Sequence, residues 1–198
     1  MTCGPEAIAL EADTTRTTTM ISSRFINRRP ELSISIRPAT REDAALILHF
    51  ITELAVFERA AHEVLATEES LQRTLLAEGS VSRALICEVD GRPAGFAVYF
   101  FSYSTWLAKN GLYLEDIYVS PECRGQGAGL ALLRHLAAIA VAADCGRFEW
   151  SVLDWNEPAI AFYRAAGAAP QNEWIRYRMD GEALQTFAQG DNEPLRAP

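Results

Sequence analysis

The pattern of hydrophobic and polar positions predicts alternating strands and helices between residues 32 and 189. Polar and apolar residues alternate over 33–37, as is typical of a half-buried strand. A helix is expected after Thr40, which can cap its N-terminus, and runs to about Glu58. A second, shorter helix is expected to begin near Thr67.

The middle of the chain predicts an antiparallel hairpin. Residues 83–89 and 93–101 are rich in β-branched and aromatic side chains. Asp90 and Gly91 join them, and this dipeptide favours a type I′ turn. A further strand is expected over 112–119.

The rest of the chain predicts a crossover connection. The expected elements are an Ala/Leu-rich helix from the glycine cluster at 125–129 to about Asp144, a strand over 148–153, a helix over 156–166 and a last strand around 174–179. Because a long helix separates the strands at 112–119 and 148–153, these two strands should be parallel. The fold class is therefore α/β, with a central mixed β-sheet flanked by helices.

The chain is long enough for one domain, over 32–189, with a sizeable core. Residues 1–31 are rich in Thr, Ser and Arg and predict a disordered tail, and residues 190–198 predict a loose C-terminal tail. No apolar run reaches the length of a membrane span, so we expect no membrane partner. The four cysteines lie far apart and predict free thiols in a reducing, cytoplasmic compartment.

Charge limits the expected partners. The formal net charge of -8 argues against binding to nucleic acid, which requires a surplus of Lys and Arg. An acidic field attracts cations, although acidity can also serve solubility alone. No Cys or His spacing matches a metal site, and we expect no metal.

A glycine-rich loop is the most informative segment. It reads Arg124-Gly125-Gln126-Gly127-Ala128-Gly129 and lies between a predicted strand and a predicted helix. Glycines let an anion approach the backbone N–H groups, and the helix N-terminus adds a positive dipole. The loop lacks the lysine of a Walker motif, and Leu130 replaces the last glycine of a dinucleotide motif. Coenzyme A remains among the candidate ligands, and the alternative is a turn that only caps the helix.

The pattern Arg124-x-x-Gly127-x-Gly129 resembles the acetyl-CoA pyrophosphate motif of the GNAT acetyltransferases, and the resemblance extends from about residue 34 to 184. Three further strings are similar to the diamine acetyltransferase group: 36–40 (IRPAT), 112–116 (LYLED) and 155–158 (WNEP), the last followed by Phe162 and Tyr163. The resemblance implies the GNAT fold, acetyl-CoA as acetyl donor, a small amine as acceptor and a homodimer.

The resemblance also implies a set of residues that bind the donor. The strand residues Ile117, Tyr118 and Val119 would pair with the pantetheine arm, and the loop residues Arg124, Gly125, Gln126, Gly127, Ala128 and Gly129 would hold the pyrophosphate. On the far side would lie Asn156, Glu157, Pro158 and Ala159. Tyr163 would lie beside the thioester sulfur.

The resemblance points to a subgroup through its substrate positions. The implied substrate-binding residues are Phe57, Glu58, Ser104, Thr105, Trp106, Glu115, Asp116, Trp155 and Asn172. Polyamine-preferring members carry Asp-Pro-Trp at 104–106 and a glutamate at 172, whereas this chain is similar to thialysine Nε-acetyltransferases there. Phe57 replaces a tyrosine that is common in the family. A polyamine acetyltransferase is the alternative, and a non-catalytic acyl-CoA-binding regulatory module is an alternative of another class.

Acetyl transfer requires a neutral amine, and a lysine-like ammonium is neutral at pH 7 only about once in a few thousand molecules. Glu115 is the candidate proton acceptor, directly or through water. Alternatively, it binds the ammonium or is an exposed carboxylate paired with an arginine. Tyr163 is the candidate acid that protonates the leaving thiolate, or else a core aromatic. Trp106 and Trp155 can form cation–π walls or only pack, and Asp116 can line the cationic pocket or orient Glu115.

Overall fold

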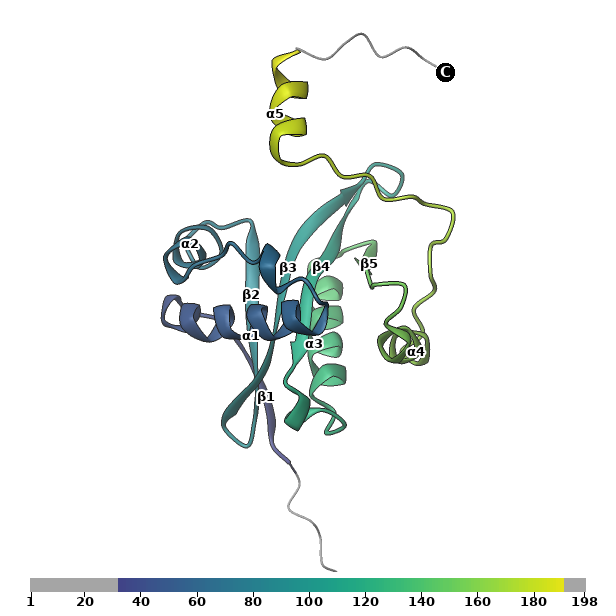
Figure 1. The fold of residues 1–198 in the computed structure, drawn as a ribbon. Helices are drawn as coiled ribbons and strands as arrows, with labels where there is room; N and C mark the ends of the chain where they lie inside the picture. Colours follow the sequence, from purple (N-terminus) through teal and green to yellow (C-terminus); the bar gives the residue numbers. More distant parts are fainter. Residues whose placement is uncertain (1–31, 191–198) are drawn as a thin grey trace, which may run out of the picture.

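The computed structural model describes residues 32–190, and Figure 1 shows how they are arranged. Its strands and α-helices are β1 (Ile34–Pro38), α1 (Ala44–Phe57), α2 (Glu68–Thr74), β2 (Ser82–Val89), β3 (Arg92–Ser104), β4 (Lys109–Val119), α3 (Ala128–Ala142), β5 (Arg147–Trp150), α4 (Glu157–Ala165) and α5 (Gly181–Gln189). The tail predicted over 1–31 and the tail predicted after residue 190 lie outside the described residues.

The five strands form one mixed sheet in the order β1-β2-β3-β4-β5. Neighbouring strands are antiparallel except β4 and β5, which are parallel, as the crossover predicted. The turn between β2 and β3 confirms the predicted type I′ geometry, because Asp90 has a φ of 51° and Gly91 a φ of 73°. The predicted fold class is therefore confirmed.

Helices cover both faces of the sheet (Figure 1). On one face α3 packs against β2, β3 and β4, and Leu112, Leu114, Leu132 and Leu136 are almost fully buried in this core. On the other face α1 and α2 cover the sheet around Phe96. Burial of aliphatic and aromatic side chains on both faces gives the two-core structure that an α/β sheet requires.

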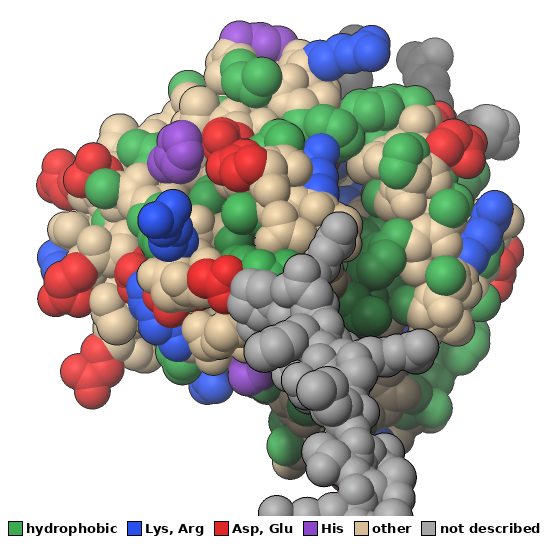
Figure 2. Space-filling model, turned by 90° about the horizontal axis from the view of Figure 1, so that it is seen from below, with side chains coloured by type: hydrophobic (Ala, Val, Ile, Leu, Met, Phe, Trp, Pro, Cys, Tyr) green, Lys and Arg blue, Asp and Glu red, His purple; other side chains and the backbone are tan. Residues whose placement is uncertain are grey.

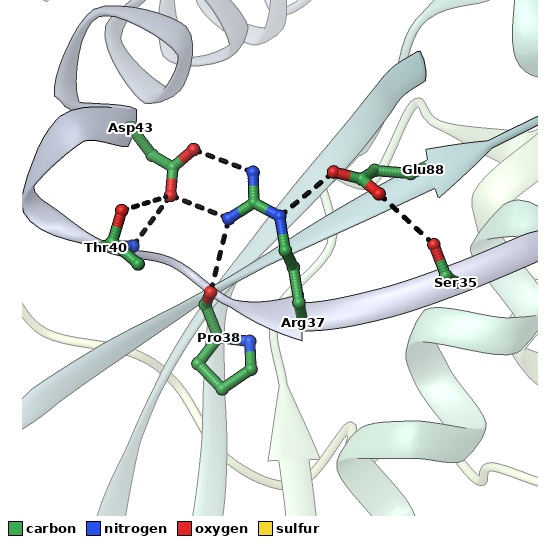
Figure 3. Close-up of polar contacts among 6 residues, drawn as sticks. All are labelled: Ser35, Arg37, Pro38, Thr40, Asp43 and Glu88. Carbon is green, nitrogen blue, oxygen red and sulfur yellow. Dashed lines mark hydrogen bonds and ion pairs between the residues drawn. The ribbon is translucent and has the colours of Figure 1, made fainter. Parts of the chain in front are cut away.

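A polar network fixes the start of α1 against the edge of the sheet (Figure 3). The guanidinium of Arg37, on β1, donates to both carboxylate oxygens of Asp43 at 2.8 Å and to Glu88 of β2 at 3.0 Å. Asp43 also accepts from the backbone N–H of Thr40 at 2.7 Å. The bonds from Arg37 lower the pKa of Asp43 to about 2, so Asp43 remains ionised and the network holds β1, β2 and the helix start together.

The C-terminal region differs from the prediction. The strand predicted around 174–179 was wrong, because this stretch has no regular secondary structure, and α5 was not predicted. Trp174, Ile175 and Tyr177 are exposed there by 68, 76 and 90%. A strand needs a neighbour for its backbone hydrogen bonds, and no described segment of this chain lies beside these residues as a strand. Figure 1 shows α5 projecting away from the sheet.

Within residues 32–190, no helix is long and apolar enough to span a bilayer.

Candidate active site

The sheet opens between β4 and β5. Their pairing runs from Gly111 opposite Arg147 to Leu114 opposite Trp150 and then stops, while β4 continues to Val119. The stretch 115–119 therefore has a strand partner only on its β3 side. Its backbone groups on the side of β5 have no strand partner, so they can pair with an extended, amide-bearing ligand. The predicted cofactor residues Ile117, Tyr118 and Val119 lie on this stretch.

Glu115 lies at a β-bulge where the strands separate. On β3, Tyr99 pairs with Leu114 and the preceding residue, Val98, pairs with Asp116, so Glu115 has no partner there. The extra residue shifts the phase of β4 by one position. As a result, residues 112 and 114 before the bulge and 117 and 119 after it all face the core beneath α3. The bulge thus places two adjacent carboxylates at the opening.

The glycine loop presents unpaired backbone donors. Within residues 32–190, no hydrogen bond is made by the N–H groups of 125–130, at the loop and the first turn of α3. Gly125 has a φ of 71° and Gly127 a φ of 93°, which side chains other than glycine adopt at a cost. These N–H groups and the positive end of the α3 dipole make a cradle that suits a diphosphate. The residues present therefore fit coenzyme A.

Arg124 and Gln126 hold the loop in place. The Nε of Arg124 donates to the backbone oxygen of Val119 at 2.9 Å, and its guanidinium lies over the ring of Phe57 at 5.3 Å. Gln126 donates to the backbone oxygen of Glu122 at 2.9 Å. Both side chains bond to the protein itself, so the structure gives them a positioning function at the loop.

An acidic group lies beside the open strand. Asp116 is partly buried, and this desolvation, together with the charges of Glu115 and Glu58, raises its pKa to about 6. Partial burial also raises the pKa of Glu58, which ends α1. The charges of Glu58 and Glu115 both act on Asp116, and an ammonium beside Asp116 would relieve the repulsion and the desolvation. The structure thus brings together the predicted residues Glu58, Glu115 and Asp116.

Tyr163 lies on α4 against the end of β5. Its ring centroid is 5.0 Å from that of Trp150 and 5.4 Å from that of Phe162, and all three pack on the core beneath α3. Burial raises the pKa of its phenol, so the group carries its proton at neutral pH. Trp150 was not among the predicted site residues, although its place at the end of a strand next to the opening could have indicated it.

The start of α4 faces the end of α1. Asn156 caps α4, and its side chain accepts from the N–H of Ala159 at 3.3 Å. Glu157 and Pro158 form the first turn, with Pro158 at a position where its missing N–H has no cost. The rings of Phe57 and Trp155 lie 5.8 Å apart, and Arg59 lies 5.6 Å from Trp155. Phe57 and Trp155, each predicted as a substrate-binding residue, are thus in contact.

Other predicted substrate residues lie outside this group. Ser104 is buried at the end of β3, where its hydroxyl accepts from the N–H of Leu107 at 3.3 Å. Thr105 and Trp106 occupy the turn between β3 and β4, and Trp106 is 88% exposed. Asn172 is exposed in the segment between α4 and α5. Within the described chain, none of these four residues hydrogen-bonds to the acidic group or to Tyr163.

Figure 2 views the molecule from the end at which α3 begins and shows a hollow with hydrophobic side chains on its walls.

Among residues 32–190, no cluster of His, Cys, Asp or Glu could hold a metal ion. The site therefore combines an open strand edge, an anion cradle, an acidic group and a partly buried phenol.

Comparison with known proteins identifies the class to which such a site belongs. The model of the acetyltransferase (GNAT) family matches residues 48–168. The mouse (Mus musculus) thialysine N-epsilon-acetyltransferase is 37% identical over 79% of this chain and 98% of its own length. The human (Homo sapiens) spermidine/spermine N(1)-acetyltransferase-like protein 1 is 32% identical over 77% of this chain and 23% of its own length. An integron cassette protein of V. cholerae superposes with a TM-score of 0.67 at 27% identity, over 79% of this chain and 98% of that one.

The chain belongs to the GNAT family of acetyltransferases. It is an N-acetyltransferase, and the family's donor is acetyl-CoA. The alternative of a non-catalytic binding module is therefore set aside.

Proposed function

We propose that this enzyme transfers the acetyl group of acetyl-CoA to the side-chain amine of thialysine or of a similar amino acid. The observation that carries the proposal is the bulge at Glu115, which places an acidic group beside the open strand edge of β4. The mouse relative, which covers most of this chain, is named for the same acceptor.

The backbone of 117–119 and the loop N–H groups would hold the donor. Acetyl-CoA supplies a thioester whose carbonyl carbon accepts the amine nitrogen. Ile117 and Val119 face the core beneath α3, which keeps this strand fixed while its open edge binds the pantetheine arm. The glycine loop would anchor the pyrophosphate at the other end.

The acidic group would bind the acceptor ammonium and take its proton. Keeping the amine protonated costs roughly 4–5 kcal/mol at the barrier for a group with a pKa near 10.4. Glu115 would accept the proton, directly or through water. Asp116 is the more desolvated carboxylate, and its raised pKa makes it a better acceptor than an ordinary aspartate. The two adjacent carboxylates can therefore share the proton.

Tyr163 would return a proton to the leaving group. When the carbon–sulfur bond breaks, the electron pair remains on sulfur, and a phenol that is protonated at neutral pH can neutralise it. Trp150 and Phe162 fix the phenol ring from two sides. The ammonium proton thus goes to the carboxylates and the tyrosine proton goes to the thiolate. The second proton, which the nitrogen loses as the amide forms, would restore the phenol.

The absence of carboxylates at two substrate positions supports an amino-acid acceptor. Ser104 is buried and bonded within its own turn, and Asn172 is neutral, so neither adds charge for a second or third ammonium. The second candidate is a polyamine acceptor. It is supported by the likeness to the spermidine/spermine acetyltransferase-like protein and by the three carboxylates themselves.

A substrate panel tests the proposal. Acetyl-CoA turnover is measured with thialysine, lysine, ornithine, putrescine and spermidine at equal concentration. We expect the highest kcat/KM with thialysine or another of the amino acids. A clear preference for spermidine would favour the polyamine acceptor. Failure with all five amines, with normal coenzyme A binding, would reject both.

We infer further that the enzyme is a homodimer in a reducing, cytoplasmic compartment. Within residues 32–190, the apolar side chains of Trp174, Ile175 and Tyr177 are exposed, and exposed apolar surface is typical of subunit interfaces. The open edge of β5 could accept such a segment from a second copy. Among the described residues, Cys87, Cys123 and Cys145 are free thiols, in keeping with that compartment.

Light scattering during gel filtration tests the dimer. We expect about twice the mass of 21.9 kDa for the native chain and a shift toward the monomer for Tyr177→Asp. Tyr103→Asp is the matched control, because Tyr103 is also exposed but lies near the turn between β3 and β4. A native chain that elutes as a monomer at micromolar concentration would contradict the proposal.

A further inference from the structure

A cavity of about 380 Å³ lies between α3 and the free edge of β2, under the segment that joins α2 to β2. His135 and Ile139 of α3 form one wall, and residues 75–77, 79 and 80 of the connecting segment form another. None of its lining residues belongs to the candidate active site. His135 lies eight residues beyond Gly127 along α3, a distance of about 12 Å on a helix.

The lining of the cavity has a positive character that contrasts with the rest of the chain. Although the protein carries 26 acidic residues, no Asp or Glu is among the described residues that line the cavity. Arg83 and His135 do line it. A cavity with a fixed cation and no carboxylate favours an anion over a cation.

Three polar side chains of the lining have no partner within residues 32–190. Arg83 makes no ion pair, and its guanidinium lies over the ring of Phe101 at 5.7 Å, which orients it and leaves its donors free. Tyr99 is only 4% exposed, yet its hydroxyl forms no hydrogen bond with the described protein. His135 likewise makes no hydrogen bond or ion pair there. Ser102 Oγ, and not this hydroxyl, is the fully buried side-chain atom without a partner among the described residues, so the Tyr99 hydroxyl keeps accessible surface and can contact a ligand in the cavity.

Apart from Ser80 and Ser82, the remaining lining is apolar, and a backbone edge lies beside it. Leu75, Leu85 and Ile139 line the cavity with aliphatic surface. Residues 82 and 83 of β2 extend past the end of β1, whose last pair joins Pro38 to Leu85, while the backbone oxygen of Ala84 still accepts from the N–H of Ala39 at 2.9 Å. The cavity thus combines a hydrophobic wall, a cation and hydrogen-bond donors, as small-molecule sites do.

We propose that this cavity is a second ligand site, which binds a small carboxylate with a short apolar body. The guanidinium of Arg83 would pair with the carboxylate, the hydroxyl of Tyr99 and the imidazole of His135 would donate to it, and the aliphatic wall would cover the apolar body. The ligand would contact both α3 and the α2–β2 segment. The proposal is independent of the acceptor amine and of the donor site.

Three six-carbon probes that differ in charge test the ligand class. Hexanoate, hexan-1-ol and hexylamine are titrated into the full-length protein saturated with coenzyme A, which occupies the donor site, and binding is followed by ¹H–¹⁵N NMR. We expect saturable shifts with hexanoate that are centred on residues 75–84 and 135–139. Hexan-1-ol should bind more weakly and hexylamine least.

Two variants test the side chains. Arg83→Gln should weaken hexanoate binding about ten-fold or more, since a charge-assisted hydrogen bond is lost. Tyr99→Phe keeps the ring and should weaken it roughly three- to ten-fold. Arg92→Gln is the matched control, because Arg92 is exposed at the turn between β2 and β3, away from the cavity, and should leave the affinity unchanged.

The proposal is overturned by any of three results. These are an absence of shifts at the cavity with millimolar hexanoate, equal affinity for hexanoate and hexylamine, or native affinity in Arg83→Gln. Melting temperatures of the variants separate loss of binding from loss of fold. If the native protein does not bind coenzyme A, the proposal that the glycine loop holds the donor fails. The hexanoate titration can then be carried out without coenzyme A and still tests the cavity.

Discussion

Gly95 of β3 faces the backbone carbonyl of Tyr118 on β4 at a distance that leaves no room for a side chain. A β-carbon built on Gly95 would overlap the Tyr118 oxygen and lie 3.0 Å from the Cα of Val119. The contact is between two backbones, so no rotamer change can relieve it. Gly95 therefore sets how closely β3 approaches β4, the strand proposed to bind the donor.

We expect Gly95→Ala to destabilise the fold by roughly 1–3 kcal/mol, since overpacking at a buried backbone contact forces the strands apart. Displacement of β4 should also raise the KM for acetyl-CoA. Urea unfolding and steady-state kinetics measure the two effects. Ala97→Gly, on the same strand, is the control that changes backbone freedom without adding volume. Native stability and KM in Gly95→Ala would show that the strands can separate at no cost.

The second prediction concerns the glycine loop, for which the chain offers a matched control. Gly125 has a φ of 71° and Gly91 a φ of 73°, and a β-carbon at either position would meet nothing within 4 Å. Alanine should therefore impose the same backbone strain at both, about 1 kcal/mol. We expect Gly125→Ala to weaken coenzyme A binding about ten-fold, because the methyl group lies where the pyrophosphate must approach. Gly91→Ala should bind normally, and equal calorimetric affinities of the two variants would contradict the cradle.

Much of the sheet and its helices could be predicted because local signals and burial agree. The Asp90-Gly91 turn and the Thr67 cap are local devices, and the observed structure keeps both. The last strand failed for the opposite reason. Its apolar side chains alternate as in a strand, but a strand also needs a neighbour, and the pattern of one chain cannot show that the neighbour is missing. The short helix α5 has mostly polar and small residues and gives a weak signal.

The candidate site was predicted unevenly for a similar reason. The loop could be recognised because closely spaced glycines indicate a backbone with positive φ angles and little side-chain cover. The bulge at Glu115 could not be recognised, since it depends on how β3 pairs with β4, although the change of phase between Leu114 and Ile117 is its trace in the sequence. Ser104 shows the converse: a residue expected at the substrate bonds within its own turn. The positions of Glu115 and Ser104 depend on contacts between residues that are distant in the sequence, and a local sequence pattern does not show such contacts.

The third prediction separates catalysis from donor binding at Tyr163. Tyr163→Phe keeps the ring that packs on Trp150 and removes only the hydroxyl. We expect kcat to fall about 10²–10³-fold, the usual scale for losing a general acid, with coenzyme A affinity nearly unchanged. Phe162→Leu, at the neighbouring position, is the control for altered packing. If kcat is native in Tyr163→Phe, another group protonates the thiolate.

The last prediction follows from the raised pKa of Asp116. The pKa is about 6 in the folded protein and 3.8 ordinarily, mainly because burial disfavours the charge. Between pH 3.8 and 6 the folded state therefore binds more protons than the unfolded state, so stability falls as the pH rises through this window. Above pH 6 Asp116 is ionised in the folded state, and the full free-energy cost of that desolvated charge lowers the stability.

Asparagine cannot ionise and escapes this cost. We expect Asp116→Asn to be more stable than the native protein by roughly 2–3 kcal/mol at pH 8, with the difference vanishing below about pH 4. Its kcat/KM should nevertheless fall at least about ten-fold, because the acidic group loses a charge that faces the ammonium. Urea unfolding from pH 4 to 8 measures the first effect, and Asp154→Asn, at an exposed carboxylate, is the control. A variant that gains no stability at pH 8 would mean that the carboxylate is compensated in the native protein, and the argument for a desolvated proton acceptor would fail with it.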